Sequence, residues 1–279
     1  NRGVKMSRHV MECLGKARVV VEDGKIIEIG EPQIEVCPLF GKHRGIEKLD
    51  KESIKENIQF RMDDFGLFTE NRIVRMPDFL SFGISEILST ALKNGLIDAA
   101  VIVADGCGTA VVTDPEIVQG LCGRISAVIE TSPIKTVMDA VGKDYVLNPE
   151  TAEIDMLSGL GKAYSMGFRN VAVTVCDAND ALSIRDVYGS TSVIMAVHTS
   201  GVSYKDAVTL FDTCDVITSC ASATLRQEAK HRDVITAGNK VPVYGVSEKG
   251  KELVRARLEE TGKKEWTGEP PEDPPKPLI

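Results

Sequence analysis

The chain has 279 residues and a formal charge of −8, from 33 Lys and Arg against 41 Asp and Glu. Hydrophobic residues make up 43% of it, which is too many for a disordered protein, and the length allows one large domain or two small ones. The acidic excess argues against a nucleic-acid or membrane-surface binder, which would need a concentrated basic face. No apolar run approaches the roughly 20 residues that cross a bilayer, so we expect a cytoplasmic protein.

The cysteine content is high and the number of cysteines is odd. A disulfide scaffold is typically short and secreted, and this chain is long with no apolar secretion segment, so we expect free thiols. No Cys-x-x-Cys pair is present. The seven positions are Cys13, Cys37, Cys107, Cys122, Cys176, Cys214 and Cys220.

Residues 6–49 are expected to form an N-terminal unit that packs on the main domain. Two β-branched runs, 18–21 and 25–29, flank Glu22-Asp-Gly24, and an Asp-Gly pair between such runs is a strong hairpin signal. A further strand is expected before residue 36, and a loop containing Cys and His follows it.

Residues 50–265 are expected to form an α/β domain, because helices and apolar strands alternate from about residue 80. The pattern predicts helices over 82–94, 153–166, 178–187, 203–212, 221–230 and 248–260, another opening at Asp114-Pro, and strands over 99–103, 126–129, 171–175, 193–197, 216–218 and 241–246. Strands that are apolar on both faces imply a mainly parallel, Rossmann-like sheet with helices on both faces. The proline-rich tail, 266–279, is expected to be extended or disordered.

Four predicted strands end in residues that can carry chemistry. Ligands of open parallel sheets bind beyond the carboxyl ends of the strands, so we expect a thiol-lined crevice there. Its candidates are Asp105, Cys107, Cys176, Asp177, His198, Thr199, Ser200, Cys220 and Ser222. Among them, Cys107, Cys176, His198 and Cys220 are the N and S donors that an iron–sulfur cluster or zinc would require.

Each of these positions also has a purely structural interpretation. The glycines Gly106, Gly108 and Gly201 either offer backbone N–H groups to an anion or only permit tight turns. Asp177 and Ser222 are equally suited to cap the helices that follow them. The segment Gly245–Lys251 has the spacing of a phosphate-binding loop but Glu252 where Ser or Thr is needed, so Ser247 as a helix cap explains it better.

A second candidate site is the loop that contains Cys37, Lys42, His43 and Arg44. Nearby cations would lower the pKa of the Cys37 thiol. The alternative is a loop whose Cys37 and Phe40 fill the core. Arg72 and Glu86 present a similar choice, either a surface salt bridge or contacts to an anion.

Several segments resemble the methanogenesis marker protein 8 family. They include Val36-Cys-Pro-Leu-Phe40, Ser81-Phe-Gly-Ile-Ser-Glu86, Val197-His-Thr-Ser-Gly201 and Cys220-Ala-Ser222, within a likeness spanning nearly all of residues 6–260. That family is confined to methane-producing archaea, so the resemblance implies a strictly anaerobic cytoplasm, where thiols stay reduced and iron–sulfur ligation is chemically easy.

A fainter likeness is to the beta subunit of deazaflavin-reducing hydrogenases. It is carried by residues 90–101, by Gly142-Lys-Asp-Tyr145 and by 171–176 followed by 181–185. The resemblance would imply a flavin or deazaflavin. This chain has Val175 where that family has proline before the cysteine, and it lacks the clustered ferredoxin-type cysteines.

These observations leave three hypotheses for the function. The first is a redox or metallocofactor accessory or maturation protein that uses the thiol-lined crevice. The second is a metal-free enzyme or carrier for a small anionic metabolite or coenzyme. The third is a non-catalytic assembly partner of a methanogenic enzyme or maturation complex. A homo-oligomer is compatible with all three.

Overall fold

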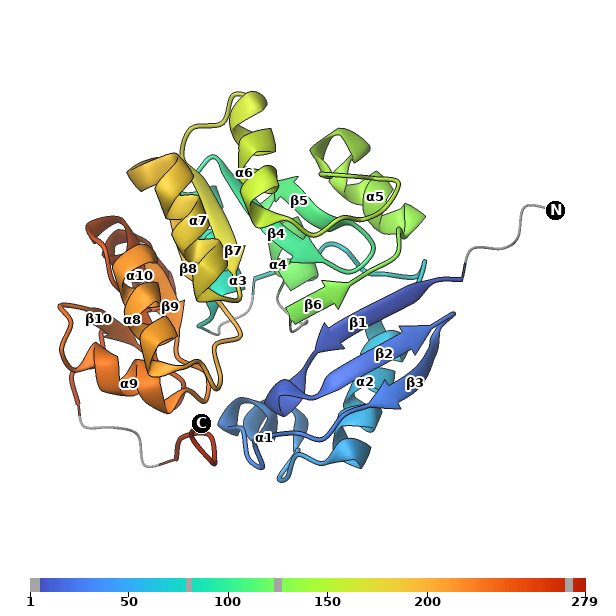
Figure 1. Cartoon of the computed structure of the whole chain (residues 1–279), viewed down its shortest axis with the longest axis horizontal. Helices are drawn as coiled ribbons and strands as arrows, with labels where there is room; N and C mark the ends of the chain where they lie inside the picture. The colour runs from blue at the N-terminus through green and yellow to red at the C-terminus, as the bar shows by residue number, and fades with distance from the viewer. Residues whose placement is uncertain (1–5, 79–81, 123–126, 269–272) are drawn as a thin grey trace.

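The computed structural model describes residues 6–78, 82–122, 127–268 and 273–279, which form two β-sheets and their helices (Figure 1). One sheet has the strand order β3-β2-β1-β6, and the other has the order β10-β11-β9-β8-β7-β4-β5. The protein is therefore a mixed α/β structure, as the sequence predicts at that level.

The four-stranded sheet is antiparallel throughout. Its strands are β1 (Arg8–Glu12), β2 (Arg18–Glu22), β3 (Lys25–Ile29) and β6 (Ala127–Glu130). The predicted hairpin is confirmed, with Asp23 and Gly24 both at positive φ in the β2–β3 turn. The additional strand expected before residue 36 is not present, since Val36 makes only an isolated bridge to Lys276.

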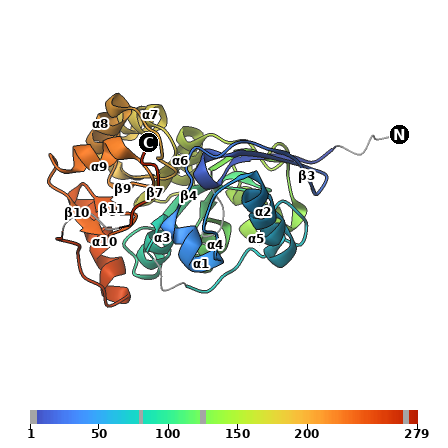
Figure 2. The ribbon, with the colours of Figure 1, turned by 90° about the horizontal axis from the view of Figure 1, so that it is seen from below.

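Helix α2 (Lys51–Phe65) covers this sheet (Figure 2). Its Ile54, Ile58 and Phe65 share one core cluster with Met11 and Val19 of the sheet. A capping box starts the helix, because Asp50 and Ser53 each accept a hydrogen bond from the other's backbone N–H. The short helix α1 (Pro38–Arg44) lies between this helix and β3 in the chain. The domain boundary expected at residue 50 stays a prediction.

The seven-stranded sheet is mixed. Strands β4, β7, β8 and β9 pair in parallel, whereas β5, β11 and β10 are joined by antiparallel pairings. The expected mainly parallel, Rossmann-like sheet is therefore not confirmed. The main reason is that residues 105–107 form a hairpin turn into an unpredicted strand instead of a connection to a helix. The strands are β4 (Ala99–Ala104), β5 (Gly108–Val112), β7 (Val171–Val175), β8 (Ser192–Ala196), β9 (Val216–Thr218), β10 (Ile235–Ala237) and β11 (Val243–Gly245).

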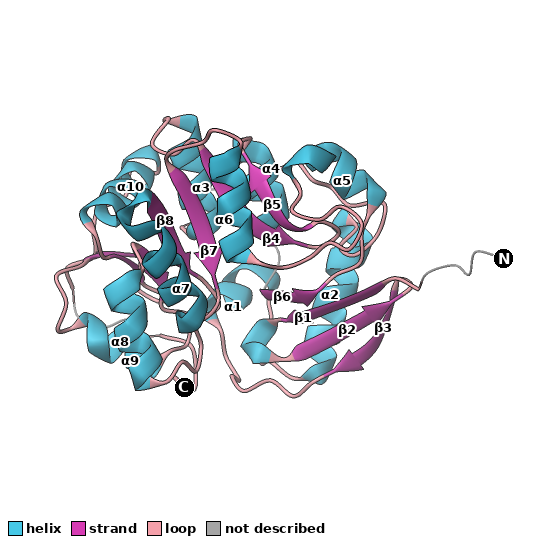
Figure 3. Cartoon of the chain, turned by 45° about the horizontal axis from the view of Figure 1, so that its top comes forward, coloured by secondary structure: helices cyan, strands magenta, loops and turns pink. Residues whose placement is uncertain are grey.

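Helices cover both faces of this sheet, as predicted (Figure 3). Alternate strand residues point to opposite cores, so Ala172 and Met195 lie in one cluster while Val173 and Ile194 lie in the other. One core includes α3 (Ile84–Lys93), α4 (Pro115–Cys122), α5 (Lys135–Val141) and α10 (Glu248–Glu260), and the other includes α6 (Met156–Ser165), α7 (Ala178–Tyr188), α8 (Tyr204–Thr213) and α9 (Ala223–Ala229). Within the described ranges, no helix is both long and apolar enough to span a bilayer.

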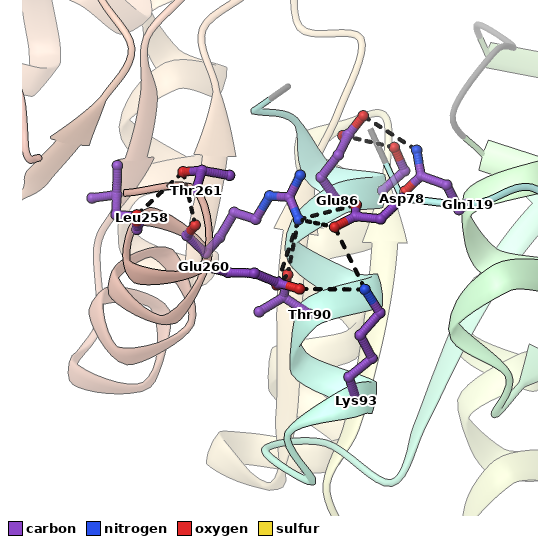
Figure 4. Close-up of polar contacts among 10 residues, drawn as sticks. Asp78, Glu86, Thr90, Lys93, Gln119, Leu258, Glu260 and Thr261 are labelled. Carbon is purple, nitrogen blue, oxygen red and sulfur yellow. Dashed lines mark hydrogen bonds and ion pairs between the residues drawn. The ribbon is translucent and has the colours of Figure 1, made fainter. Parts of the chain in front are cut away.

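A polar cluster joins α3 to α10 (Figure 4). The fully buried Arg257 donates to both carboxylate oxygens of Asp78, at 3.0 and 2.8 Å. Lys93 bridges Asp78 and Glu260 at 3.5 and 3.3 Å. The sequence left open whether Glu86 forms a surface salt bridge or contacts an anion. In the structure Glu86 is buried beside this cluster and accepts hydrogen bonds from Ser85 and Gln119. It is a structural group on the inside of α3.

A second buried ion pair joins the segment after α2 to the end of β4. Arg72 Nε lies 3.1 Å from both oxygens of Asp105, and neither side chain is exposed. The same carboxylate accepts a hydrogen bond from the Phe68 N–H at 3.0 Å, and Arg72 also donates to the Gly120 carbonyl of α4. Arg72 is therefore neither a surface ion pair nor an anion contact.

The described part of the proline-rich tail is ordered by backbone pairing. Lys276 exchanges hydrogen bonds with Val36 of the N-terminal layer, and Ile279 does so with Ala221 and Ala223 after β9. These hydrogen bonds connect residues 273–279 to both layers, whereas residues 269–272 of the predicted tail lie outside the described residues. In Figure 1 the C-terminus lies between α1 and α9.

We expect Arg72→Met to lower the free energy of unfolding by about 3–5 kcal/mol, because it leaves the Asp105 carboxylate buried without its cation. Urea denaturation would measure this. Arg72→Met combined with Asp105→Leu should recover part of the loss. The control is Arg75→Met, which removes an exposed ion pair to Asp114 and should change stability much less. Equal losses in the two single variants would contradict the assignment.

Candidate functional site

Three of the predicted site residues meet at one edge of the seven-stranded sheet. Cys176 directly follows β7, while His198 and Cys220 come two residues after β8 and β9. These strands are parallel neighbours, so their carboxyl ends lie together. The N-terminal layer adds Glu12 at the end of β1, Lys16 and Cys37. We call Glu12, Lys16, Cys37, Cys176, His198 and Cys220 the strand-exit cluster.

A carboxylate–imidazole contact connects the two layers in this cluster. His198 Nε2 lies 2.7 Å from Glu12 Oε1, and Lys16 Nζ lies 3.7 Å from the same oxygen. The hydrogen bond to His198 lowers the pKa of Glu12; partial burial opposes this shift, and the charges of His198 and Lys16 reinforce it. Glu12 is therefore held as a carboxylate, the form that can orient an imidazole for proton transfer.

Burial keeps the thiols of Cys37 and Cys176 protonated at neutral pH. Loss of hydration raises the pKa of Cys176 to about 12, and the charges of Asp177, Asp180 and Glu12 add to the shift. The residue is nevertheless exposed, so water reaches its side chain. The Cys220 thiol also contributes to this shift.

Cys37 contradicts the expectation of an activated thiolate. Burial raises the pKa of its thiol, and Cys220 adds to the shift. The cations expected to lower it do not do so: Lys42 is exposed, and the Arg44 guanidinium lies 4.2 Å from the centre of the Phe60 ring. The side chain of His43 lies outside the described residues. Both Cys37 and Phe40 pack against the N-terminal core, as the structural alternative proposed.

The backbone at the cluster is unusual. Six non-glycine residues in the described part of the chain have a positive φ, and three belong to the cluster: Lys16 (64°), His198 (54°) and Cys220 (43°). Such conformations cost about 1–3 kcal/mol each for non-glycine residues and are concentrated at functional sites. This coincidence is independent of the chemical type of the side chains, and it supports a functional role for the cluster.

The structure does not bring Cys107 together with the other candidate ligands. Cys107 is fully buried, and its Sγ contacts the Gly108 carbonyl at 3.5 Å; burial and the charge of Asp105 raise its thiol pKa. Gly106 and Gly108 both have a positive φ in the β4–β5 turn. Gly108 also lies so close to residue 152 that a Cβ there would be 2.1 Å from the Ala152 carbonyl oxygen. Across the described ranges, no three His, Cys, Asp or Glu side chains are positioned to hold one metal ion.

The polar residues beside the cluster have structural partners. Asp177 and Ser222 cap α7 and α9, as their structural interpretation held, and Ser247 caps α10. The hydroxyls of Thr199 and Ser200 bond to Thr218 O and Ala221 N. Gly201, a predicted anion-binding residue, has φ 74° and lies against the side chains of Ile279 and Lys16. These contacts fix the loops that present His198 and Cys220.

Sequence reasoning missed Glu12 and Lys16. Both lie in or directly after β1, which was not predicted, and nothing in their local sequence points to His198, which is 186 positions from Glu12. The predicted hairpin that follows them was the available signal, since a third strand beside it would have placed Glu12 at a strand end.

The fold and the cluster together define an α/β protein in which a second, antiparallel sheet closes against the strand exits of the main sheet. The chain belongs to the archaeal family DUF2099, whose description is "Uncharacterized protein conserved in archaea" and whose model matches residues 9–259. An uncharacterized protein of Methanocaldococcus jannaschii is 46% identical over 263 residues, covering 92% of this chain and 93% of the relative. No solved structure matches the chain.

We expect Glu12→Gln to destabilise the protein by about 1 kcal/mol near neutral pH, because the Glu12 carboxylate is stabilised in the folded state. The pKa of Glu12 is lower in the folded protein than its unfolded value of 4.5, so its carboxylate stabilises the folded state above pH 4.5. This stabilisation is lost as the pH falls through the folded pKa. Urea denaturation of both proteins should therefore give a difference at pH 7 that closes below pH 4.5. Glu28→Gln, in an exposed pair with Arg18, is the control. A difference that persists in acid would count against the contact.

Removing residues 273–279 should make Cys37 and Cys220 react faster with an alkylating reagent. The tail hydrogen-bonds to the residues next to both thiols, and its loss lets these segments open locally. Mass spectrometry would give the rate at each cysteine, with an increase of several-fold expected at these two. Cys214, which follows α8 and is buried in the core that includes this helix, is the internal control. Unchanged rates would show that the tail does not cover the cluster.

Proposed function

We propose that this protein is a redox or metallocofactor accessory protein of methane-producing archaea, and that the strand-exit cluster receives a soft metal ion or a metal cluster. The observation that carries the proposal is the convergence of Cys176, His198 and Cys220 at neighbouring strand ends. Thiolate and imidazole are the donors that zinc and iron–sulfur clusters prefer. The resemblance to methanogenesis marker protein 8 and the relative from a methanogen support the setting.

Electrostatics favour a cation over a thiol reaction at this site. Cys176 is kept protonated by loss of hydration and by the carboxylates of Asp177, Asp180 and Glu12, so it is a poor nucleophile for thiol–disulfide exchange. The same carboxylates attract a metal ion. A bound metal displaces the thiol proton and relieves the repulsion between thiolate and carboxylate.

The donors are gathered but not preassembled, which suits a protein that transfers a metal. Within the described chain no ready three-ligand site exists, so binding requires side-chain rotation or movement of the N-terminal layer. Cys37, whose thiol pKa is raised mainly by burial and also by Cys220, is a further thiol donor on the N-terminal layer. A site formed only on binding holds its metal less tightly than a rigid one.

Anaerobic zinc titration of the full chain against a chelator tests this proposal. We expect Cys176→Ala and Cys220→Ala to weaken binding about tenfold or more, and the matched variant Cys214→Ala, which alters a core thiol, to leave it unchanged. Binding should tighten as the pH rises from 6 to 8, about tenfold per unit for each thiol proton displaced. Absence of binding, or equal loss in all three variants, would contradict the proposal.

The Glu12–His198 contact favours a second candidate function, acid–base chemistry on a small anionic metabolite or coenzyme held by Lys16. Titration of the full chain and of Lys16→Ala, with zinc and separately with flavin or deazaflavin, distinguishes the two functions. A metal site loses little from this change, whereas an anion site loses its cation. Flavin and deazaflavin are the coenzymes that the hydrogenase resemblance suggests as probes.

A further inference from the structure

A pocket of about 370 Å³ lies at the β10 edge of the seven-stranded sheet, far along the sheet from β5. It is formed by the β10–β11 turn, the residues that follow α10 and the residue that precedes the first turn of α3. None of its residues belongs to the strand-exit cluster. The lining residues are Phe82, Gly238, Asn239, Leu258, Lys263, Lys264 and Trp266.

The pocket presents a fixed aromatic surface to solvent. Trp266, the one tryptophan of the sequence, is 38% exposed, although its backbone N–H is anchored to the Thr236 carbonyl of β10 at 2.7 Å. Gly268 passes so close to the indole that a Cβ there would lie 2.8 Å from the ring. Gly268 therefore packs against part of the indole while the residue as a whole stays exposed, and the partly buried Phe82 adds a second ring to the same lining. Such a surface suits a planar, aromatic ligand.

The pocket also carries two adjacent cations, Lys263 and Lys264. Lys263 and Lys264 are both exposed, and among the described residues neither forms an ion pair. The carboxylates nearest in sequence are already engaged, since Glu265 pairs with Arg255 at 2.8 Å and Glu260 with Lys93 (Figure 4). In a chain of charge −8, two adjacent lysines that have no ion pair within the described residues and lie beside the exposed Trp266 mark a place for an anionic group.

We propose that this pocket binds a small nucleotide, with the base against Trp266 and Phe82 and the phosphate at Lys263 and Lys264. The Asn239 amide, which can both donate and accept, is placed to read the edge of the base. The volume lies in the range of small-molecule pockets. The ligand needs both a base and a phosphate. A base alone would not neutralise the two lysines, and a phosphate alone would not contact the aromatic rings.

Titration of the full chain with AMP tests the proposal, since quenching of Trp266 reports binding directly. For AMP we expect saturable quenching below about 1 mM. Adenosine and inorganic phosphate should each bind about tenfold more weakly than AMP. The double variant Lys263→Gln with Lys264→Gln should lose a similar factor in AMP affinity. Lys249→Gln, an α10 lysine paired with Glu252, is the matched control and should bind normally. Calorimetry extends the series to Trp266→Ala, which should lose about tenfold, and to Trp266→Phe, which should restore most of it.

Three results would overturn the proposal. The first is the absence of saturable quenching up to about 5 mM AMP. The second is unchanged affinity in the double lysine variant, which would remove the phosphate contact. The third is equal affinity for AMP and inorganic phosphate, which would show an anion site without a base contact.

Discussion

The buried ion pair between Arg72 and Asp105 is the constraint on which the arrangement of the two sheets depends. Its carboxylate lies at the end of β4 and also accepts from Phe68, while its guanidinium reaches the Gly120 carbonyl of α4. One pair therefore fixes a strand end, a helix and the segment that leaves the N-terminal layer. Because an unpaired charge there would cost several kcal/mol, the protein's own groups fill this strand exit. The residues of the strand-exit cluster lie instead at the exits of β7, β8 and β9.

The strand-exit cluster depends on this placement because its residues come from both layers. The His198–Glu12 contact, the docking of Ala221 in the N-terminal core and the pairing of Lys276 with Val36 all cross between them. The three left-handed residues Lys16, His198 and Cys220 flank the same boundary. Backbone strain of this kind persists only where the surrounding structure holds it in place, and contacts from both layers do so here.

Most strands of the seven-stranded sheet can be predicted from the sequence, but the way the N-terminal layer packs against that sheet cannot. Strands β7 and β9 and helix α10 begin and end where predicted, because buried β-branched runs and a serine cap are local signals. Strand β5 was missed because its apolar residues after Gly108 look the same in a hairpin as in a connection to a helix. Helix α2 was missed although Ile54, Ile58, Met62 and Phe65 have helical spacing.

The candidate site was predictable only on its sheet side. Cys176, His198 and Cys220 follow strands that can be recognised locally, and their convergence is a rule of parallel sheets. Cys107 follows a strand just as recognisable, but the hairpin turn directs it into the core. Glu12 and Lys16 come from a layer whose docking is set by long-range packing. Glu12 changes the site's electrostatics, because its carboxylate contacts His198 and adds to the rise in the pKa of Cys176 that loss of hydration chiefly causes. A site composed only of the residues that follow the strands would lack this carboxylate and the Lys16 ammonium beside it.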